Sequence, residues 1–128
     1  AEMFSLDENC LKLFDEMMNL LLELKGSKDI ANYLNSSLAD REKAPLALDI
    51  LELIFSDVLS VSSLKKGRIP GREKDINDIA KGYSIAACAV INGRINEARK
   101  KLTLNINAVT VAERLLFEIL EAKYKWQQ

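Results

Sequence analysis

Apolar side chains recur at three- and four-residue steps along almost the whole chain, and this spacing limits what the chain can fold into. The first such series consists of Leu6, Cys10, Leu13, Phe14, Met17, Leu20, Leu21 and Leu24. The repeat matches the turn of an α-helix, about 3.6 residues, so these side chains share one helix face. Only two prolines and five glycines are present to interrupt helices of this kind. The sequence therefore predicts an all-α fold.

The same periodicity and its interruptions divide the chain into segments. We expect helices over residues 6–25, 28–38, 45–66, 73–80, 83–104 and 107–125. Gly26 and Gly67 supply two of the breaks. The β-branched stretch 103–111 leaves a short strand there as an alternative. At 128 residues, the chain is predicted to form a single domain, residues 1–128, built as a compact bundle of five to six helices.

Composition argues against several classes of function. The 18 basic and 19 acidic residues nearly cancel, so no overall field draws the chain toward a polyanion or an acidic membrane. The absence of histidine removes the commonest acid/base group and the commonest metal ligand. Neither a GxSxG nor a GxxxxGK[ST] motif occurs, and the paired carboxylates lie on polar helix faces. We expect no catalysis by this chain, no cofactor and no metal.

The cysteines and the apolar runs bear on where the chain works. Cys10 and Cys88 lie in apolar helical surroundings without CxxC spacing, so we expect two buried thiols rather than a disulfide, in a reducing, cytoplasmic compartment. No apolar run approaches the roughly 20 residues that span a bilayer, so no membrane association is expected. The chain begins within an amphipathic pattern without an initiator Met, and we therefore expect it to be a fragment of a longer protein.

A basic stretch, 65–74, has the sequence KKGRIPGREK. Its five cations are Lys65, Lys66, Arg68, Arg72 and Lys74, against one acid. These side chains could contact phosphates, which makes a helical nucleic-acid-binding module one hypothesis for the chain. The other interpretation is that they are solvated cations near helix C-termini, where they complement the helix dipole. No aromatic stacking partner lies nearby in the sequence, which favours the second interpretation.

The last predicted helix is more apolar than docking on a single core requires. Its apolar side chains are Leu115, Leu116, Phe117, Ile119, Leu120 and Tyr124, with Trp126 beyond them. Either the helix is buried inside the domain, or one of its faces contacts another protein chain. These side chains, from Leu115 to Tyr124, are the candidate subunit interface.

Two asparagines separate the last two predicted helices. Asn105 can adopt the left-handed conformation that ends a helix. Asn107 can accept a hydrogen bond from an unpaired backbone N–H and so begin the next helix, which stabilises it by about 1 kcal/mol. Together they predict a tight corner.

Leu102, Asn105, Asn107 and Glu113 form the spacing L-x-x-N-x-N-x-x-x-x-x-E, followed by leucines. This spacing resembles the closing segment of the bacterial DNA polymerase III clamp-loader subunits, delta-prime first and then gamma/tau or delta. The segment 51–67 is similar to a family segment in which an Arg-Asp pair precedes a leucine-rich helix. Asp57 matches the acid, and Ser56 stands where the arginine is usual.

The resemblance implies that this chain is a C-terminal collar domain. In that family the collar domains of five subunits pack into a ring that supports loading of the sliding clamp in DNA replication. The upstream AAA+ modules, which bind ATP, clamp and DNA, would be absent from this fragment. The expected partners are therefore gamma/tau and delta subunits, with DNA contacted only through the whole complex. Glu113 is expected to pair with Arg99 or Lys101 across the corner.

Overall fold

A computed structural model describes residues 8–64 and 71–126. Its helices are α1 (Glu8–Glu23), α2 (Ser27–Ile30), α3 (Ala44–Leu64), α4 (Glu73–Ala80), α5 (Ile85–Thr103) and α6 (Ala108–Lys125), with short 3-10 helices η2 (Ala31–Tyr33) and η3 (Ser37–Ala39). No strand occurs in these two described ranges. The all-α bundle is confirmed, and the 103–111 stretch is a helix end, a corner and a helix start rather than a strand.

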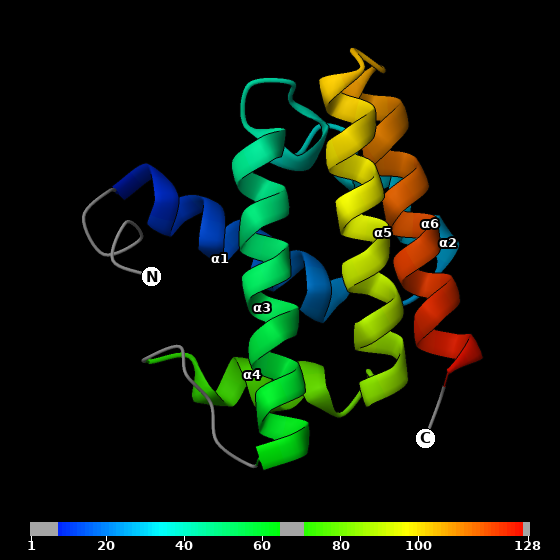
Figure 1. Ribbon diagram of the computed structural model, residues 1–128. Coiled ribbons are helices and arrows are strands. Elements are labelled where there is room, and N and C mark those ends of the chain that lie inside the picture. The colour runs from blue at the N-terminus through cyan, green and yellow to red at the C-terminus, as the bar shows by residue number, and fades with distance from the viewer. Residues whose placement is uncertain (1–7, 65–70, 127–128) are drawn as a thin grey trace.

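The long helices α3, α5 and α6 stand side by side, and the shorter helices α1, α2 and α4 pack around them (Figure 1). Helix α5 packs between α3 and α6. Helix α1 crosses behind α3, and α4 lies across the lower end of α3. The short helix η3 packs against both α6 and α3. This arrangement leaves the α5–α6 corner at the top of the bundle, opposite α4.

Helix α3 is the centre of the core. Its innermost side chains are completely buried: Ala47, Leu48, Ile50, Leu51, Ile54, Phe55 and Val58. The rings of Phe55 and the buried Tyr83 meet edge to face, with 5.2 Å between the ring centroids and 79° between the planes. Burying a large side chain stabilises the fold by about 1.5–3 kcal/mol relative to leaving it in water. Because α1, α4 and α5 all pack on this helix, it determines where they lie.

The predicted helix over 28–38 is wrong in its length. After α2 the chain continues as two 3-10 helices joined by a turn. The backbone N–H and the hydroxyl of Ser37 both donate to the Glu16 carboxylate of α1, at 2.9 and 2.6 Å. These tertiary hydrogen bonds hold the chain against α1 and replace the i→i−4 bonds of a longer helix.

The asparagine corner has the predicted geometry. Asn105 adopts φ 63°, the left-handed conformation, and it is the one non-glycine residue with positive φ in the described chain. The N–H of Ile106 donates to the carbonyl of Lys101 at 3.0 Å, which closes the end of α5. The Asn107 side-chain oxygen accepts from the N–H groups of Val109 (2.8 Å) and Thr110 (3.2 Å) and so caps the start of α6.

Asn107→Ala should lower the free energy of unfolding by about 1 kcal/mol, because two N–H groups of the first turn of α6 lose their acceptor. Urea unfolding followed by circular dichroism measures the change. Asn35→Ala is the matched control, since Asn35 is exposed and its side chain makes no hydrogen bond within the described residues. Equal stability of the two variants would contradict the assigned capping role.

Candidate functional site

The predicted interface on α6 is wrong for four of its six residues. Leu115, Leu116, Ile119 and Leu120 are buried inside the domain itself. Helix α6 packs against α5, η3 and α2, so a broad apolar face is needed within one molecule. The other two residues remain accessible, with Phe117 47% and Tyr124 50% exposed.

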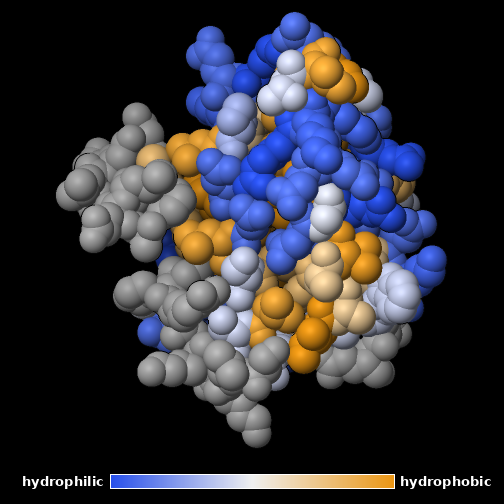
Figure 2. All heavy atoms as spheres, in the orientation of Figure 1, coloured by the Kyte–Doolittle hydropathy of each residue, from blue (hydrophilic) through white to orange (hydrophobic). Residues whose placement is uncertain are grey.

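A different apolar surface lies at the α5–α6 corner. Leu104 is 73% exposed, Val109 40% and Ile106 37%, and we call these three side chains the corner patch. Figure 2 shows hydrophobic atoms over this corner, surrounded by hydrophilic ones. The sequence pattern assigns these residues only to a helix boundary. The alternation of Leu104 and Ile106 with Asn105 and Asn107 is the signal that could have found the patch, because a turn that needed only solubility would carry polar residues there.

Arg41 fastens the corner to the segment before α3. Its guanidinium donates to the backbone carbonyls of Leu102 (3.5 Å) and Ile106 (3.4 Å) and to the Asn105 side-chain oxygen. All three acceptors are neutral, and within residues 8–64 and 71–126 Arg41 forms no ion pair. The Asn105 side chain is therefore held by a residue more than sixty positions away, in addition to shaping the corner.

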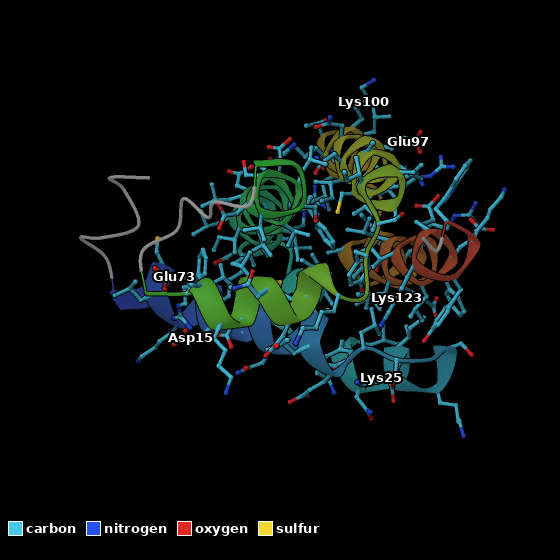
Figure 3. All side chains as sticks on the ribbon, turned by 90° about the horizontal axis from the view of Figure 1, so that it is seen from below. Asp15, Lys25, Glu73, Glu97, Lys100 and Lys123 are labelled. Atoms are coloured by element: carbon cyan, nitrogen blue, oxygen red, sulfur yellow. The ribbon has the colours of Figure 1, made fainter. Side chains whose placement is uncertain are left out.

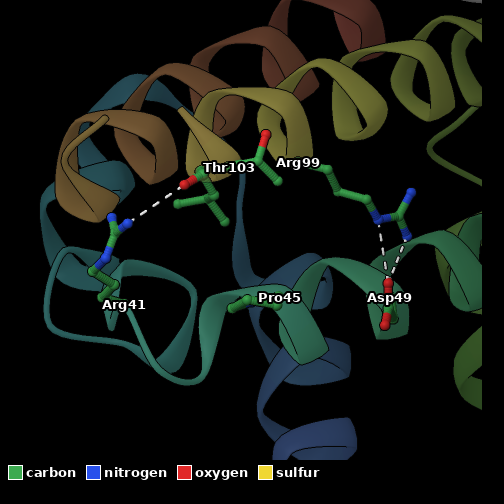
Figure 4. Close-up of a pocket in the computed structure, with 6 residues that line it drawn as sticks. Arg41, Pro45, Asp49, Arg99 and Thr103 are labelled. Carbon is green, nitrogen blue, oxygen red and sulfur yellow. Dashed lines mark hydrogen bonds and ion pairs between the residues drawn. The ribbon is translucent and has the colours of Figure 1, made fainter. Parts of the chain in front are cut away.

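Two surface pockets share Arg41 as a lining residue. The first has a volume of about 270 Å³ and is lined by Arg41, Pro45, Asp49, Arg99, Leu102 and Thr103 (Figure 4). The second has a volume of about 530 Å³ and is lined by Ala39, Arg41, Asn105, Asn107, Ala108 and Val109. Val109 of the corner patch lines the second pocket, so this pocket opens beside the patch.

The expected pairing of Glu113 with Arg99 or Lys101 is wrong. Arg99 reaches from α5 to α3, where it donates to Asp49 (2.9 Å) and Glu52 (2.8 Å). Although partial burial acts to lower the pKa of Arg99, the hydrogen bonds that it donates to Glu52 and Asp49 outweigh this effect, and the pKa is raised. Glu113 is exposed and forms no ion pair with another residue of the described chain.

The basic stretch is described only in part. Lys65, Lys66 and Arg68 lie outside the described residues. Arg72 pairs with Asp15 of α1, stands 3.7 Å from Asp75, and lies over the Phe14 ring. Figure 3 places Asp15 near the start of α4. Arg72 is thus already neutralised, whereas Lys74 is exposed.

The remaining residues of the family motif lie inside the domain. Leu102 is buried in the core at the end of α5. Asp57 is 1% exposed on α3, and it is engaged with a partner. Burial of a carboxylate is costly unless it is paired or hydrogen-bonded, and the interaction that Asp57 makes offsets that cost. The resemblance therefore combines two core positions, two residues that shape the corner and the exposed Glu113.

No family model, curated protein or solved structure matches this chain. Within the described ranges, no group of three or more histidine, cysteine or acidic side chains is placed to hold a metal ion. None of the described helices is both long enough and apolar enough to cross a bilayer.

Arg99→Gln should destabilise the domain by about 0.5–1 kcal/mol, because one guanidinium joins two carboxylates of the neighbouring helix. The loss should shrink in high salt, which screens partly exposed ion pairs. Unfolding in urea at two salt concentrations measures both effects. Glu113→Gln is the control and should leave stability unchanged. If Glu113→Gln lowered the free energy of unfolding as much as Arg99→Gln, a pairing of Glu113 with Arg99 or Lys101 would be supported after all.

Both cysteines are buried thiols and form no disulfide, as predicted. Burial raises the pKa of the Cys88 thiol to about 11, so at pH 8 only on the order of one molecule in a thousand carries the reactive thiolate. In a Cys10→Ser variant we expect Cys88 to react with a disulfide reagent at least about a hundredfold more slowly in the folded protein than in guanidinium, where its pKa is ordinary. Absorbance of the released thiol measures the rate, and equal rates would contradict the buried assignment.

Proposed function

We propose that this chain is a non-catalytic assembly domain of the kind that forms the collar of the bacterial DNA polymerase III clamp loader. The observation that carries the proposal is the exposed corner patch next to two asparagines that fix its geometry. Asn105 ends α5 and Asn107 caps α6, and these two residues belong to the spacing on which the resemblance rests.

The connection between α5 and α6 is unusual because it carries an exposed apolar patch. Single exposed apolar side chains are common on soluble proteins, but three together on a capped turn are characteristic of a contact surface. Leu104 contributes little to the core in this position, because most of its surface is in contact with solvent. Burial against a neighbouring subunit would remove that surface from water.

The proposed partners are gamma/tau and delta subunits of the loader, and the proposed identity is delta-prime, ahead of gamma/tau and delta. In this role the domain would keep neighbouring subunits in order and would reach DNA only through the whole complex. ATP hydrolysis would belong to other domains or subunits. The resemblance supplies these identities, and the exposed corner supports the use of a helical domain for assembly.

We expect the chain to bind a purified gamma/tau-type subunit and to show no affinity for primed DNA, each measured at low and high salt by sedimentation velocity. Apolar burial is little affected by salt, whereas phosphate contacts weaken steeply as salt increases. Strong, salt-sensitive DNA binding without a protein partner would instead support the nucleic-acid-binding module using residues 65–74. Lys74→Gln is the informative variant for that outcome, because Lys74 is the exposed cation of the stretch that lies in the described chain.

A further inference from the structure

From the contacts around Arg41, we infer that the α5–α6 corner docks a protein segment that combines apolar side chains with a carboxylate, the carboxylate pairing with Arg41 and the apolar groups covering the corner patch. This inference rests on the proposed assembly function and adds the chemistry of the partner at the contact. A carboxylate is the ligand that best matches a guanidinium held in place but not neutralised.

The Arg41 guanidinium has capacity left for a partner. An arginine presents five N–H donors, and the three hydrogen bonds to Leu102, Asn105 and Ile106 occupy three of them. The N–H on Nε and one on Nη1 remain. Because those three acceptors orient the side chain, a partner carboxylate would meet an arginine that has already lost part of its rotamer entropy.

The positive charge of Arg41 is not needed to balance the end of α5. The C-terminus of a helix carries roughly half a negative charge, and Lys100 and Lys101 lie in the last turn of α5 to offset it. The acid that lines the first pocket, Asp49, is already engaged by Arg99. The charge of Arg41 is therefore available to a group from another molecule.

The apolar part of the contact is defined by the second pocket. Arg41 is the charged side chain among those lining this pocket, which it shares with the apolar Ala108 and Val109. Val109 belongs both to the pocket and to the corner patch, so a segment entering beside Arg41 would meet the patch at Val109 and could extend from there over Leu104 and Ile106. Apolar surface alone would accept many partners, whereas a single fixed cation beside it selects for a carboxylate at one position.

The first experiment uses a defined probe and does not depend on a clamp-loader partner. A short amphipathic peptide of leucine and glutamate is titrated into the isotope-labelled chain, and a twin peptide has glutamine in place of every glutamate. Chemical-shift changes at the Leu104 and Val109 methyl groups and at Arg41 Nε report binding. We expect the glutamate peptide to bind at the corner about tenfold more tightly than its twin, and Arg41→Gln to abolish that difference.

Three further variants show whether the corner itself is responsible for binding. Leu104→Asp should abolish the shifts without unfolding the domain, since Leu104 is largely exposed. Leu11→Asp on α1 and Lys74→Gln on α4 are matched controls at an exposed apolar and an exposed basic position, and both should bind the peptide like the parent chain. Equal affinity for the two peptides, or no shifts at the corner at millimolar peptide, would overturn the inference.

A second experiment separates this inference from the proposed function. Binding to the gamma/tau-type subunit is measured for the parent chain, Arg41→Gln and Leu104→Asp. If the subunit binds all three equally, the inference fails, and the assembly function stands only with its contact on a surface other than the corner patch. If the peptide binds at the corner but the subunit does not bind the chain at all, the clamp-loader assignment fails and the inference stands. Self-association of the chain that Leu104→Asp abolishes would identify a second copy as the occupant and overturn the inference.

Discussion

Burial of α3 on nearly every side is the constraint from which the rest of the bundle follows. Between Ala44 and Ser62, the exposed positions are Pro45 and Asp49, in the first turns of the helix. A helix with so little free surface must be covered by several neighbours, and α1, α4 and α5 supply most of the cover. Once α5 is fixed against α3, α6 covers a remaining face of α5, and the connection between them must turn sharply.

The polar contacts of the bundle refine this packing rather than create it. Arg99 holds α5 to two carboxylates of α3, and Arg94 reaches Glu118 of α6 at 3.7 Å. Nearer the C-terminus of α6, the Lys123 ammonium lies 3.3 Å from the Leu24 carbonyl, which ties α6 to the end of α1 (Figure 3). Each such pair contributes far less than the apolar burial beneath it, but it fixes the angle and register of neighbouring helices.

Local signals in the sequence were sufficient to predict the long helices and the corner. The apolar spacing of α1 and α3 reflects a single backbone repeat, and the conformations of Asn105 and Asn107 depend on their immediate neighbours. Segment 31–39 could not be predicted in this way, because the acceptor that reshapes it, Glu16, lies 21 residues away from Ser37. Arg41 was missed for the same reason, since its partners are separated from it by more than sixty positions.

The error on α6 has a different physical origin and explains where the exposed surface lies. A run of leucines indicates that a helix is covered, but it cannot indicate whether the cover is the same chain or another one. Here α2, η3 and α5 provide the cover, so Leu115 and Ile119 are buried internally. The corner patch stays outside, because Asn105 and Asn107 fix the backbone that carries it. A patch on such a fixed turn would lose little backbone conformational entropy if a partner covered it, which is why the corner, rather than the leucine face of α6, is the proposed contact.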